Sequence, residues 1–483
     1  MAEHFDVIVV GAGLSGIGAA HRLQTECPDR SYVVLEGRAA SGGTWDLFRY
    51  PGVRSDSDMF TLGYGFRPWT GDRTIADGAS ILRYLRDTAR EAGIDRHIRY
   101  RHRMIAADWS SADARWTVTI DRDDGQVTMT CSFLFLCTGY YDYAKGYRPE
   151  FAGEAAFAGR IVHPQFWPAD LDYAGKRVVV IGSGATAMTL VPAMAGTAAR
   201  VTMVQRSPTY VVAVPERDRT VTAMRRILPA RIAHAIARVS RIVIGQAFYA
   251  ASRRWPGPVR AALLRRVRRA LPPGYDVNRD FTPRYDPWDQ RVCVVPDGDL
   301  FAAIRAGRAA VATGRIDRFT ATGIRMEDGR EIPADIVVTA TGLELKLFGD
   351  VPLTIDGVAT NPAEATNYKG LMLSGIPNLA FTFGYTNASW TLKSDLTARY
   401  VCRLLNAMRD RGAVQVMPRI GKDGTGDAPL LDFTAGYIRR GIRRFPKQGS
   451  RTPWRAHQNY ARDMMALRFG SIDDAMEFVG QTT

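Results

Sequence analysis

The stretch Phe5-Asp-Val-Ile-Val-Val10-Gly11-Ala-Gly13-Leu-Ser-Gly16 near the N-terminus predicts the fold of the chain. Its first six residues are typical of a buried strand, and the segment from Ile17 to Leu23 is helical in pattern. A Gly-x-Gly-x-x-Gly pattern is specific only in this setting, between a strand and a helix. There, Gly11 allows a tight turn, Gly13 lets the backbone approach a pyrophosphate, and Gly16 permits close packing of helix on strand. The stretch therefore predicts a Rossmann-like dinucleotide site, with a glycine turn that binds nothing as the alternative.

The acceptor position of this first loop is Glu36. It follows a strand pattern at Tyr32 to Leu35 and lies twenty residues beyond Gly16. A carboxylate there accepts hydrogen bonds from ribose hydroxyls and repels a 2′-phosphate. The first site is therefore predicted to take FAD or NAD rather than NADP.

A second loop of the same kind follows the strand pattern Arg177-Val-Val-Val-Ile181. It reads Gly182-Ser-Gly184-Ala-Thr-Ala187, the variant that ends in alanine. Its second strand, Val201 to Val204, runs into Gln205-Arg206-Ser207, so an arginine and a serine stand where the first loop has a carboxylate. Because this pair suits a 2′-phosphate, the second cofactor is predicted to be NADPH.

The two halves end alike, which supports a repeated unit. Phe133-Leu-Phe-Leu-Cys-Thr-Gly139 closes the first half, and Asp335-Ile-Val-Val-Thr-Ala-Thr-Gly342 closes the second. No third glycine loop follows. We therefore predict an α/β fold with two Rossmann-like dinucleotide-binding domains: residues 1–150 begin the FAD domain, 151–334 form the NADP domain with a helical insertion at about 215–290, and 335–483 return to the FAD domain and form a C-terminal segment.

The net charge of +15 is concentrated in the insertion. From Arg219 to Arg269 there are thirteen arginines and no lysine, aspartate or glutamate, interleaved with apolar residues. This pattern predicts basic amphipathic helices. A solvated face is the first interpretation and peripheral contact with an anionic membrane is the second. Nucleic acid is not expected, because no recognised binding module accompanies the charge.

Composition limits the class of protein and its compartment. An apolar content of 46% is that of a folded globular chain, and no apolar run approaches the ~20 residues that span a bilayer. No secretory signal is evident. The five cysteines show no Cys-x-x-Cys or zinc-ligand spacing, so neither a metal site nor disulfide-reductase chemistry is expected. The expected location is the cytoplasm, with the inner face of the cell membrane as the site of any peripheral contact.

Between the two loops lies Phe157-Ala-Gly159-Arg-Ile-Val-His163-Pro-Gln-Phe-Trp167-Pro168. Its prolines and aromatic residues indicate a packed connector. The pattern also resembles the fingerprint of type I Baeyer-Villiger monooxygenases at every fixed position. Further stretches beginning at Trp45, Asn387 and Lys447 resemble mycobacterial members of this family that oxidise thioamides.

The resemblance implies roles for individual residues. Arg291 would stabilise the anionic oxygen species, Asp56 would hold that arginine, and His163 would couple the linker to NADP. Tyr385, Asn387 and Trp390 would line the substrate pocket, with core packing as an equal explanation. The FAD contacts would be Gly11, Gly13, Ser15, Gly16, Glu36, Gly43, Thr44, Trp45, Asp46, Leu47, Asp56 and Met104. The NADP contacts would be Arg54, Ser183, Gly184, Ala185, Thr186, Arg206 and Ser207.

The resemblance also implies a reaction. NADPH would reduce FAD, O2 would add at flavin C4a, and the resulting peroxyflavin would convert a ketone into an ester or lactone, or oxidise a sulfide or thioamide. Two alternatives stay open: a flavin monooxygenase limited to S- or N-oxidation, and a membrane-associated NADPH flavoprotein reductase. The expected partners are O2 and a ketone or organosulfur molecule.

Overall fold

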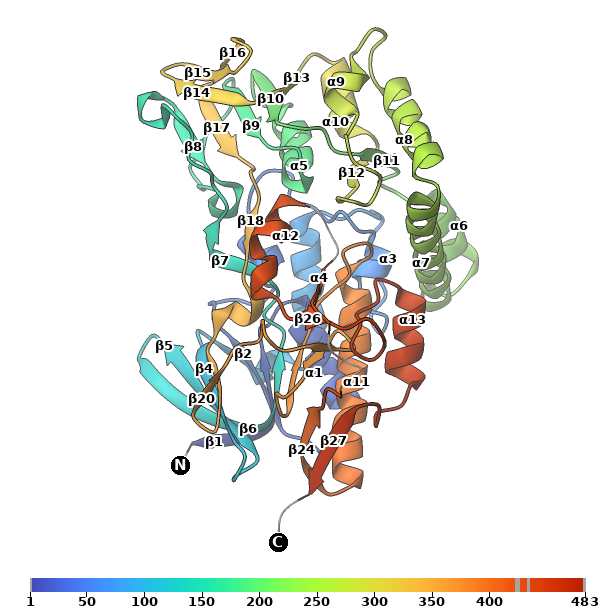
Figure 1. Ribbon diagram of the computed structural model, residues 1–483. Coiled ribbons are helices and arrows are strands. Elements are labelled where there is room, and N and C mark those ends of the chain that lie inside the picture. The colour runs from blue at the N-terminus through green and yellow to red at the C-terminus, as the bar shows by residue number, and fades with distance from the viewer. Residues whose placement is uncertain (1, 422–425, 432–434, 481–483) are drawn as a thin grey trace.

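The structure is a computed structural model that describes residues 2–421, 426–431 and 435–480. Two open sheets form its two halves (Figure 1), and each places a glycine loop at the end of its first central strand. The chain has the mixed α/β architecture expected from its repeated strand-loop-helix pattern.

The first sheet has nine strands, and its centre is parallel. β1 lies between β2 and β6, and β23 pairs with β6 although it comes more than 240 residues later. Central strands are apolar on both faces because helices or other strands cover them. The strands are β1 (Glu3–Val10), β2 (Tyr32–Glu36), β3 (Ile98–Tyr100), β4 (Arg103–Ser110), β5 (Arg115–Arg122), β6 (Gly125–Leu136), β19 (Leu353–Ile355), β20 (Val358–Thr360) and β23 (Leu379–Phe381).

Helices cover this sheet and bring the last third of the chain against the first glycine loop. α1 packs on α11, and both contribute to one buried apolar cluster with the central strands. The helices are α1 (Leu14–Glu26), α2 (Thr44–Leu47), α3 (Met59–Leu62), α4 (Gly78–Glu91), α11 (Trp390–Asp410), α12 (Gly436–Gly441) and α13 (Tyr460–Met464).

The second sheet has five strands, all parallel, in the order β13-β10-β9-β17-β8. α5 and α10 pack beside it, and a three-stranded antiparallel sheet extends it. The elements are β8 (Arg160–Val162), β9 (Arg177–Ile181), α5 (Ala185–Met194), β10 (Arg200–Gln205), α10 (Asp299–Arg305), β13 (Ala309–Thr313), β14 (Ile316–Thr320), β15 (Gly323–Met326), β16 (Glu331–Pro333) and β17 (Ile336–Thr339).

Three helices, α6, α7 and α8, make up the arginine-rich region and form the right-hand edge of the molecule in Figure 1, and the short helix α9 follows them. Two parallel strands enclose them in sequence. The elements are β11 (Val211–Val214), α6 (Arg219–Ile227), α7 (Ala230–Arg254), α8 (Pro256–Ala270), α9 (Val277–Phe281) and β12 (Cys293–Pro296). Among the described residues, no helix is both long enough and apolar enough to cross a bilayer.

Small two-stranded sheets join the remaining segments. The pair of β7 and β18 matters most for the site, because it runs between the two halves. The strands are β7 (Tyr141–Gly146), β18 (Leu343–Leu345), β21 (Asn367–Tyr368), β22 (Met372–Leu373), β24 (Ala413–Pro418), β25 (Ala428–Pro429), β26 (Lys447–Gln448) and β27 (Met476–Gly480).

Candidate functional site

A cavity of about 1170 Å³ lies between the two sheets and is lined by both glycine loops. This volume exceeds the roughly 300–1,000 Å³ that is common for a single small-ligand pocket. The lining comes from β1 and α1 on one side and from β9 and α5 on the other. The cavity therefore has room for more than one bound molecule.

The two loops are built in the same way. Gly11 has a φ of +105° and Gly182 a φ of +136°, values that favour glycine. A Cβ at Gly11 would lie 2.6 Å from the Cys137 carbonyl oxygen, and one at Gly182 would lie 2.2 Å from that of Ala340. In each half, the residue after a central strand, Cys137 after β6 and Ala340 after β17, therefore places its carbonyl against the glycine turn.

The helix starts behind these turns are free to bind an anion. Gly13 precedes α1 and Gly184 precedes α5, and neither supplies a side-chain cap. The first backbone N–H groups of both helices therefore have no capping side chain as a hydrogen-bond acceptor. They also lie at the positive end of the helix dipole. Both glycines line the cavity. This arrangement fits one pyrophosphate at each loop.

Glu36 beside the first glycine loop and Arg206 beside the second give the two ends of the cavity opposite charges. Glu36 lies at the end of β2, where its carboxylate accepts hydrogen bonds from Ala12 N at 2.8 Å and Arg38 N at 2.9 Å. Burial raises the pKa of Glu36, and these two hydrogen bonds oppose that rise. Arg206 follows β10 with an exposed side chain, next to Ser207, whose carbonyl accepts a hydrogen bond from Ser183 Oγ at 3.0 Å. The carboxylate at the first loop suits the ribose hydroxyls of FAD, and the arginine at the second loop suits the 2′-phosphate of NADPH.

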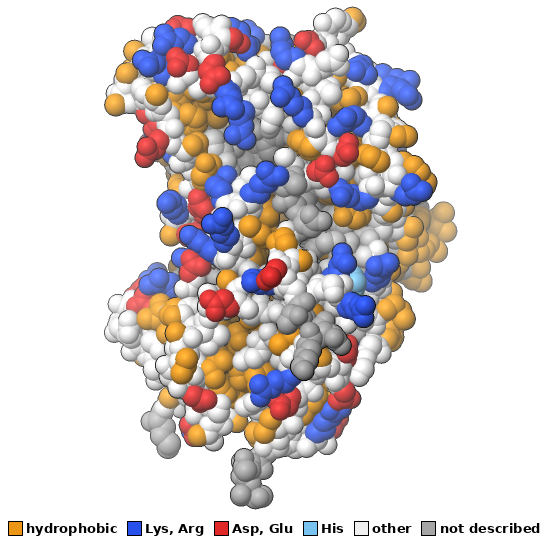
Figure 2. All heavy atoms as spheres, viewed as in Figure 1, with side chains coloured by type: hydrophobic (Ala, Val, Ile, Leu, Met, Phe, Trp, Pro, Cys, Tyr) orange, Lys and Arg blue, Asp and Glu red, His pale blue; other side chains and the backbone are white. Residues whose placement is uncertain are grey.

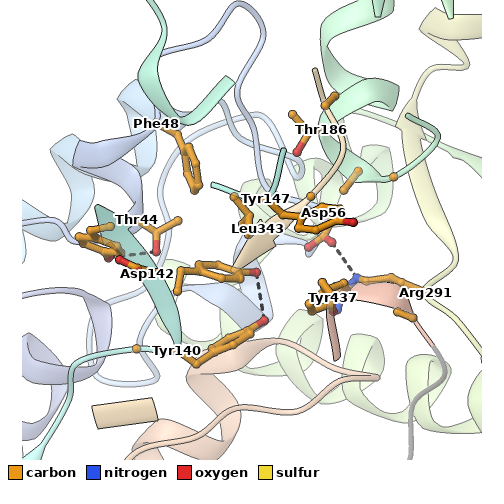
Figure 3. Close-up of a pocket in the computed structure, with 18 of the residues that line it drawn as sticks. Thr44, Phe48, Asp56, Tyr140, Asp142, Tyr147, Thr186, Arg291, Leu343 and Tyr437 are labelled. Carbon is orange, nitrogen blue, oxygen red and sulfur yellow. Dashed lines mark hydrogen bonds and ion pairs between the residues drawn. The ribbon is translucent and has the colours of Figure 1, made fainter. Parts of the chain in front are cut away.

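The structure brings together Arg291 and Asp56, which both line the cavity. Arg291 Nε lies 2.7 Å from Asp56 Oδ2, and Arg291 Nη1 donates to the Thr386 carbonyl at 3.1 Å. Figure 3 shows the two side chains pointing toward each other. Burial opposes the charged form of Arg291, but the attraction of Asp56 is among the effects that raise its pKa above the usual value. The guanidinium is therefore a permanent positive charge at the cavity wall.

Four phenols line the cavity, and Tyr140, Tyr141 and Tyr437 lie near this charge. Tyr140 and Tyr141 are hydrogen-bonded through their hydroxyls at 3.0 Å, and Tyr437 lies beside the Arg291–Asp56 pair in Figure 3. Tyr143 lies 3.4 Å from Thr44 Oγ1 through its hydroxyl. Burial raises the pKa of all four phenols, that of Tyr143 to about 12. They are hydrogen-bond donors at neutral pH.

The three residues expected at the substrate face differ in position. Trp390 lines the cavity, stacks on Tyr140 with ring centroids 5.0 Å apart, and donates from Nε1 to Ser15 Oγ at 2.8 Å. Tyr385 also lines it, but its hydroxyl donates to Asp463 Oδ2 at 2.7 Å. Asn387 does not line the cavity; its amide donates to the Gln458 carbonyl at 2.8 Å. Asn387 thus joins its own loop to the segment around Gln458 and does not face the cavity.

The connector fingerprint lies outside the cavity lining. A Cβ at Gly159 would lie 2.2 Å from the Asp335 carbonyl oxygen, so the connector touches the start of β17. His163 Nε2 lies 3.3 Å from the Gly342 carbonyl oxygen, and Nδ1 accepts from Gln165 N at 3.2 Å. Burial lowers the pKa of His163. The fingerprint residues Phe157, Gly159, His163, Trp167 and Pro168 are absent from the lining.

Most of the other predicted residues do line the cavity. Three of the first set do not: Gly16, whose Cβ would lie 1.8 Å from the Gly11 carbonyl oxygen, Asp46 and Leu47. The Asp46 carboxylate is held by Arg38 at 2.7 Å and by Arg86 at 2.8 Å. The residues in the lining are Gly11, Gly13, Ser15, Glu36, Gly43, Thr44, Trp45, Arg54, Asp56, Met104, Ser183, Gly184, Ala185, Thr186, Arg206, Ser207 and Arg291.

Other lining residues were missed in the sequence. Tyr140, Tyr141 and Tyr143 come soon after Thr138-Gly139 in the segment that follows β6, so a cluster of aromatic residues after a strand was the available signal. Arg315 lines the cavity just after β13 and adds a second cation to the end that holds Arg206. Tyr437 comes from α12, and no local pattern marks it.

Comparison with known proteins decides the family. Residues 9–75 match the NAD(P)-binding Rossmann-like domain family, and residues 74–244 match the flavin-binding monooxygenase-like family. The chain is 56% identical over 476 residues to the FAD-containing monooxygenase EthA of Mycobacterium tuberculosis, covering 98% of this chain and 97% of EthA. The chain belongs to the FAD-containing monooxygenase family.

Further similarities agree with this family. The EthA of Mycolicibacterium smegmatis is 53% identical over 98% of this chain and 96% of its own length. Among solved structures, an oxidized steroid monooxygenase bound to NADP superposes with a TM-score of 0.77, covering 99% of this chain and all of that chain at 22% identity. At that identity the structural match shows a shared fold.

Proposed function

We propose that this monooxygenase is an FAD- and NADPH-dependent Baeyer-Villiger enzyme. In the overall reaction, a ketone, O2, NADPH and a proton give an ester or lactone, water and NADP+. One oxygen atom of O2 enters the C–C bond next to the carbonyl, and the other leaves as water. The observation that carries the proposal is the Arg291–Asp56 pair at the wall of a cavity shared by two glycine loops.

When bound, the flavin supplies reduction by NADPH and activation of O2. The residues of this chain provide the environment. Arg291 places a fixed positive charge where an anionic oxygen and the negative charge of a carbonyl adduct are stabilised. Asp56 and the Thr386 carbonyl fix the direction of the guanidinium. Such a charge is effective because it is oriented before the reaction begins.

A second activity, oxidation of sulfides or thioamides, is supported by the phenols. An anionic oxygen donor attacks a carbonyl carbon, whereas a protonated one is an electrophile toward sulfur. Tyr140, Tyr141 and Tyr437 line the cavity near Arg291 and remain protonated donors at neutral pH. The cavity therefore offers both a charge that favours the anion and neutral hydroxyls that can donate a hydrogen bond to the oxygen donor.

The experiment is turnover under 18O2 with a panel of linear ketones, cyclic ketones and sulfides, followed by mass spectrometry. We expect NADPH-dependent esters or lactones that carry one 18O atom. Sulfoxides without any ester would reject the ketone reaction in favour of S-oxidation. Hydrogen peroxide as the sole oxygen product with every substrate would reject oxygen transfer and favour a flavoprotein reductase.

We also propose that the enzyme works in the cytoplasm and touches the inner face of the cell membrane. All five cysteines are buried and unpaired, as suits a reducing compartment.

A further inference from the structure

One face of α7 carries an exposed apolar stripe. Ile232, Ile236, Val239 and Val243 keep 50%, 45%, 60% and 59% of their surface exposed. Their spacing of four, three and four residues places them on a single face of the helix. Figure 2 shows apolar side chains gathered at the right-hand edge, where α7 lies in Figure 1. Three more exposed apolar residues lie on or beside this helix: Ile227, Ile244 and Trp255.

The opposite face of α7 is anchored to the body of the enzyme. Ala233, His234 and Ala237 are buried there. Arg238 Nη1 donates to the carbonyls of Phe60 and Gly63, both at 2.7 Å, and so fixes the helix against α3. The exposed stripe is therefore held outward by a defined contact.

The arginines of this segment divide into three groups. Arg238 and Arg225 point inward, and Arg225 Nη1 donates to the Gly71 carbonyl at 3.1 Å. Three others form ion pairs with aspartates outside the segment: Arg241 with Asp218, Arg253 with Asp289 and Arg260 with Asp286. The rest are exposed, and from Arg219 to Arg269 the segment itself contains no acidic residue. Arg254 lies over the ring of exposed Trp255, at 5.9 Å from its centroid, where α7 ends. The exposed arginines outside these three ion pairs are Arg219, Arg226, Arg231, Arg254, Arg265, Arg266, Arg268 and Arg269.

The exposed arginines and the apolar stripe on α7 together indicate which kind of partner binds this face. A second copy of this chain, docked through the same face, would bring the exposed arginines of the two copies together. An anionic bilayer supplies negative headgroups and an apolar layer beneath them, which matches both features. A tryptophan beside an arginine at the helix end is typical of the headgroup region.

We infer that the outer face of α7, defined by Ile232, Ile236, Val239 and Val243, inserts into the headgroup layer of an anionic membrane. The exposed arginines hold the surrounding phosphates. This inference deepens the peripheral contact proposed above and does not depend on the reaction. Arg225 and Arg238 serve the fold and do not meet lipid.

The test is flotation of the FAD-loaded enzyme with vesicles of phosphatidylcholine, with or without phosphatidylglycerol. We expect binding to the anionic vesicles alone, weakened by added salt. The double variant Val239→Gln/Val243→Gln should bind at least roughly tenfold more weakly, since two apolar side chains no longer enter the lipid. Val358→Gln is the matched control, because Val358 is 70% exposed on β20.

The charge is tested by Arg226→Gln/Arg231→Gln, which should lower binding to anionic vesicles, whereas Arg83→Gln on the exposed side of α4 should not. Equal binding to both vesicle types, or unchanged binding of the double valine variant, would overturn the inference. So would a parent dimer that the valine variant turns into a monomer. Turnover of a water-soluble ketone is measured for each variant. It distinguishes a variant that has lost only membrane binding from one that has lost catalytic activity.

Discussion

Arg291 Nε lies 2.7 Å from Asp56 Oδ2, although the two residues are 235 positions apart in the chain. The contact joins the loop after α9 to the loop before α3, and both side chains face the cavity. An ion pair that is partly exposed adds little to stability. We therefore assign this pair to orientation of a charge rather than to holding the fold.

Replacing Arg291 by alanine should separate reduction from oxygen transfer. The variant should still oxidise NADPH and reduce FAD, because neither glycine loop is touched. Product formation should fall about 100- to 1,000-fold, the cost of removing one oriented group that stabilises a developing negative charge. Anaerobic flavin bleaching and aerobic product yield measure the two steps. Normal ester formation by this variant would show that the charge has another role.

Arg206→Ala should change the choice of nicotinamide cofactor. Loss of the guanidinium removes a partner of the 2′-phosphate, so KM should rise roughly 10- to 100-fold for NADPH and stay nearly constant for NADH. Arg200→Ala is the control, since Arg200 is exposed at the opposite end of β10. Equal changes with both cofactors would reject the phosphate role.

The sequence predicts those parts of the site that local chemistry defines. The glycine turns at Gly11 and Gly182 and the contrast between Glu36 and Arg206 follow from strand-loop-helix patterns, because backbone sterics and charge act locally there. No local pattern in either segment predicts that Arg291 lies close to Asp56. That prediction came from the family resemblance.

Other residues could not be placed by pattern. Tyr437 reaches the cavity through α12, and no periodicity in the sequence specifies where that helix docks. Asp46 is predicted to contact FAD; it is absent from the lining, and its carboxylate forms ion pairs with three arginines. Asn387 was expected at the substrate face, but its amide is used by the Gln458 carbonyl. The Asn387 contact joins residues 71 positions apart, whereas Asp46 pairs with Arg38 and Arg49 nearby and with Arg86 at a distance of 40 positions.

Gly184→Ala should test whether a pyrophosphate approaches the second loop. A Cβ at Gly184 meets no atom within 4 Å, so the substitution should leave the melting temperature and the FAD content nearly unchanged. If a phosphate sits against this backbone, KM for NADPH should rise roughly tenfold or more. Gly196→Ala in the same half also meets open space and is the matched control. Unaltered NADPH kinetics would place the pyrophosphate elsewhere.

His234 should make the contact of α7 with α3 sensitive to acid. Its side chain is 2% exposed, and among the described residues neither ring nitrogen has a hydrogen-bond partner. Burial, aided by Arg238 and Arg225, lowers its pKa from 6.5 to about 4. The pKa of His234 in the folded state lies below its value in the unfolded state. The contribution of the neutral ring to the free energy of unfolding is therefore complete above pH 6.5 and is lost as the pH falls toward about 4.

The corresponding variant is His234→Leu, which removes the titrating ring without breaking a hydrogen bond. At pH 7 its free energy of unfolding should be close to that of the parent. As the pH falls toward 4 the variant should become the more stable of the two, by at most about 3 kcal/mol, because the parent must bury a ring that the unfolded chain protonates. Denaturant unfolding of the FAD-loaded enzymes at pH 7 and pH 5 measures the difference. A gap that is the same at both pH values would mean that His234 does not titrate on unfolding.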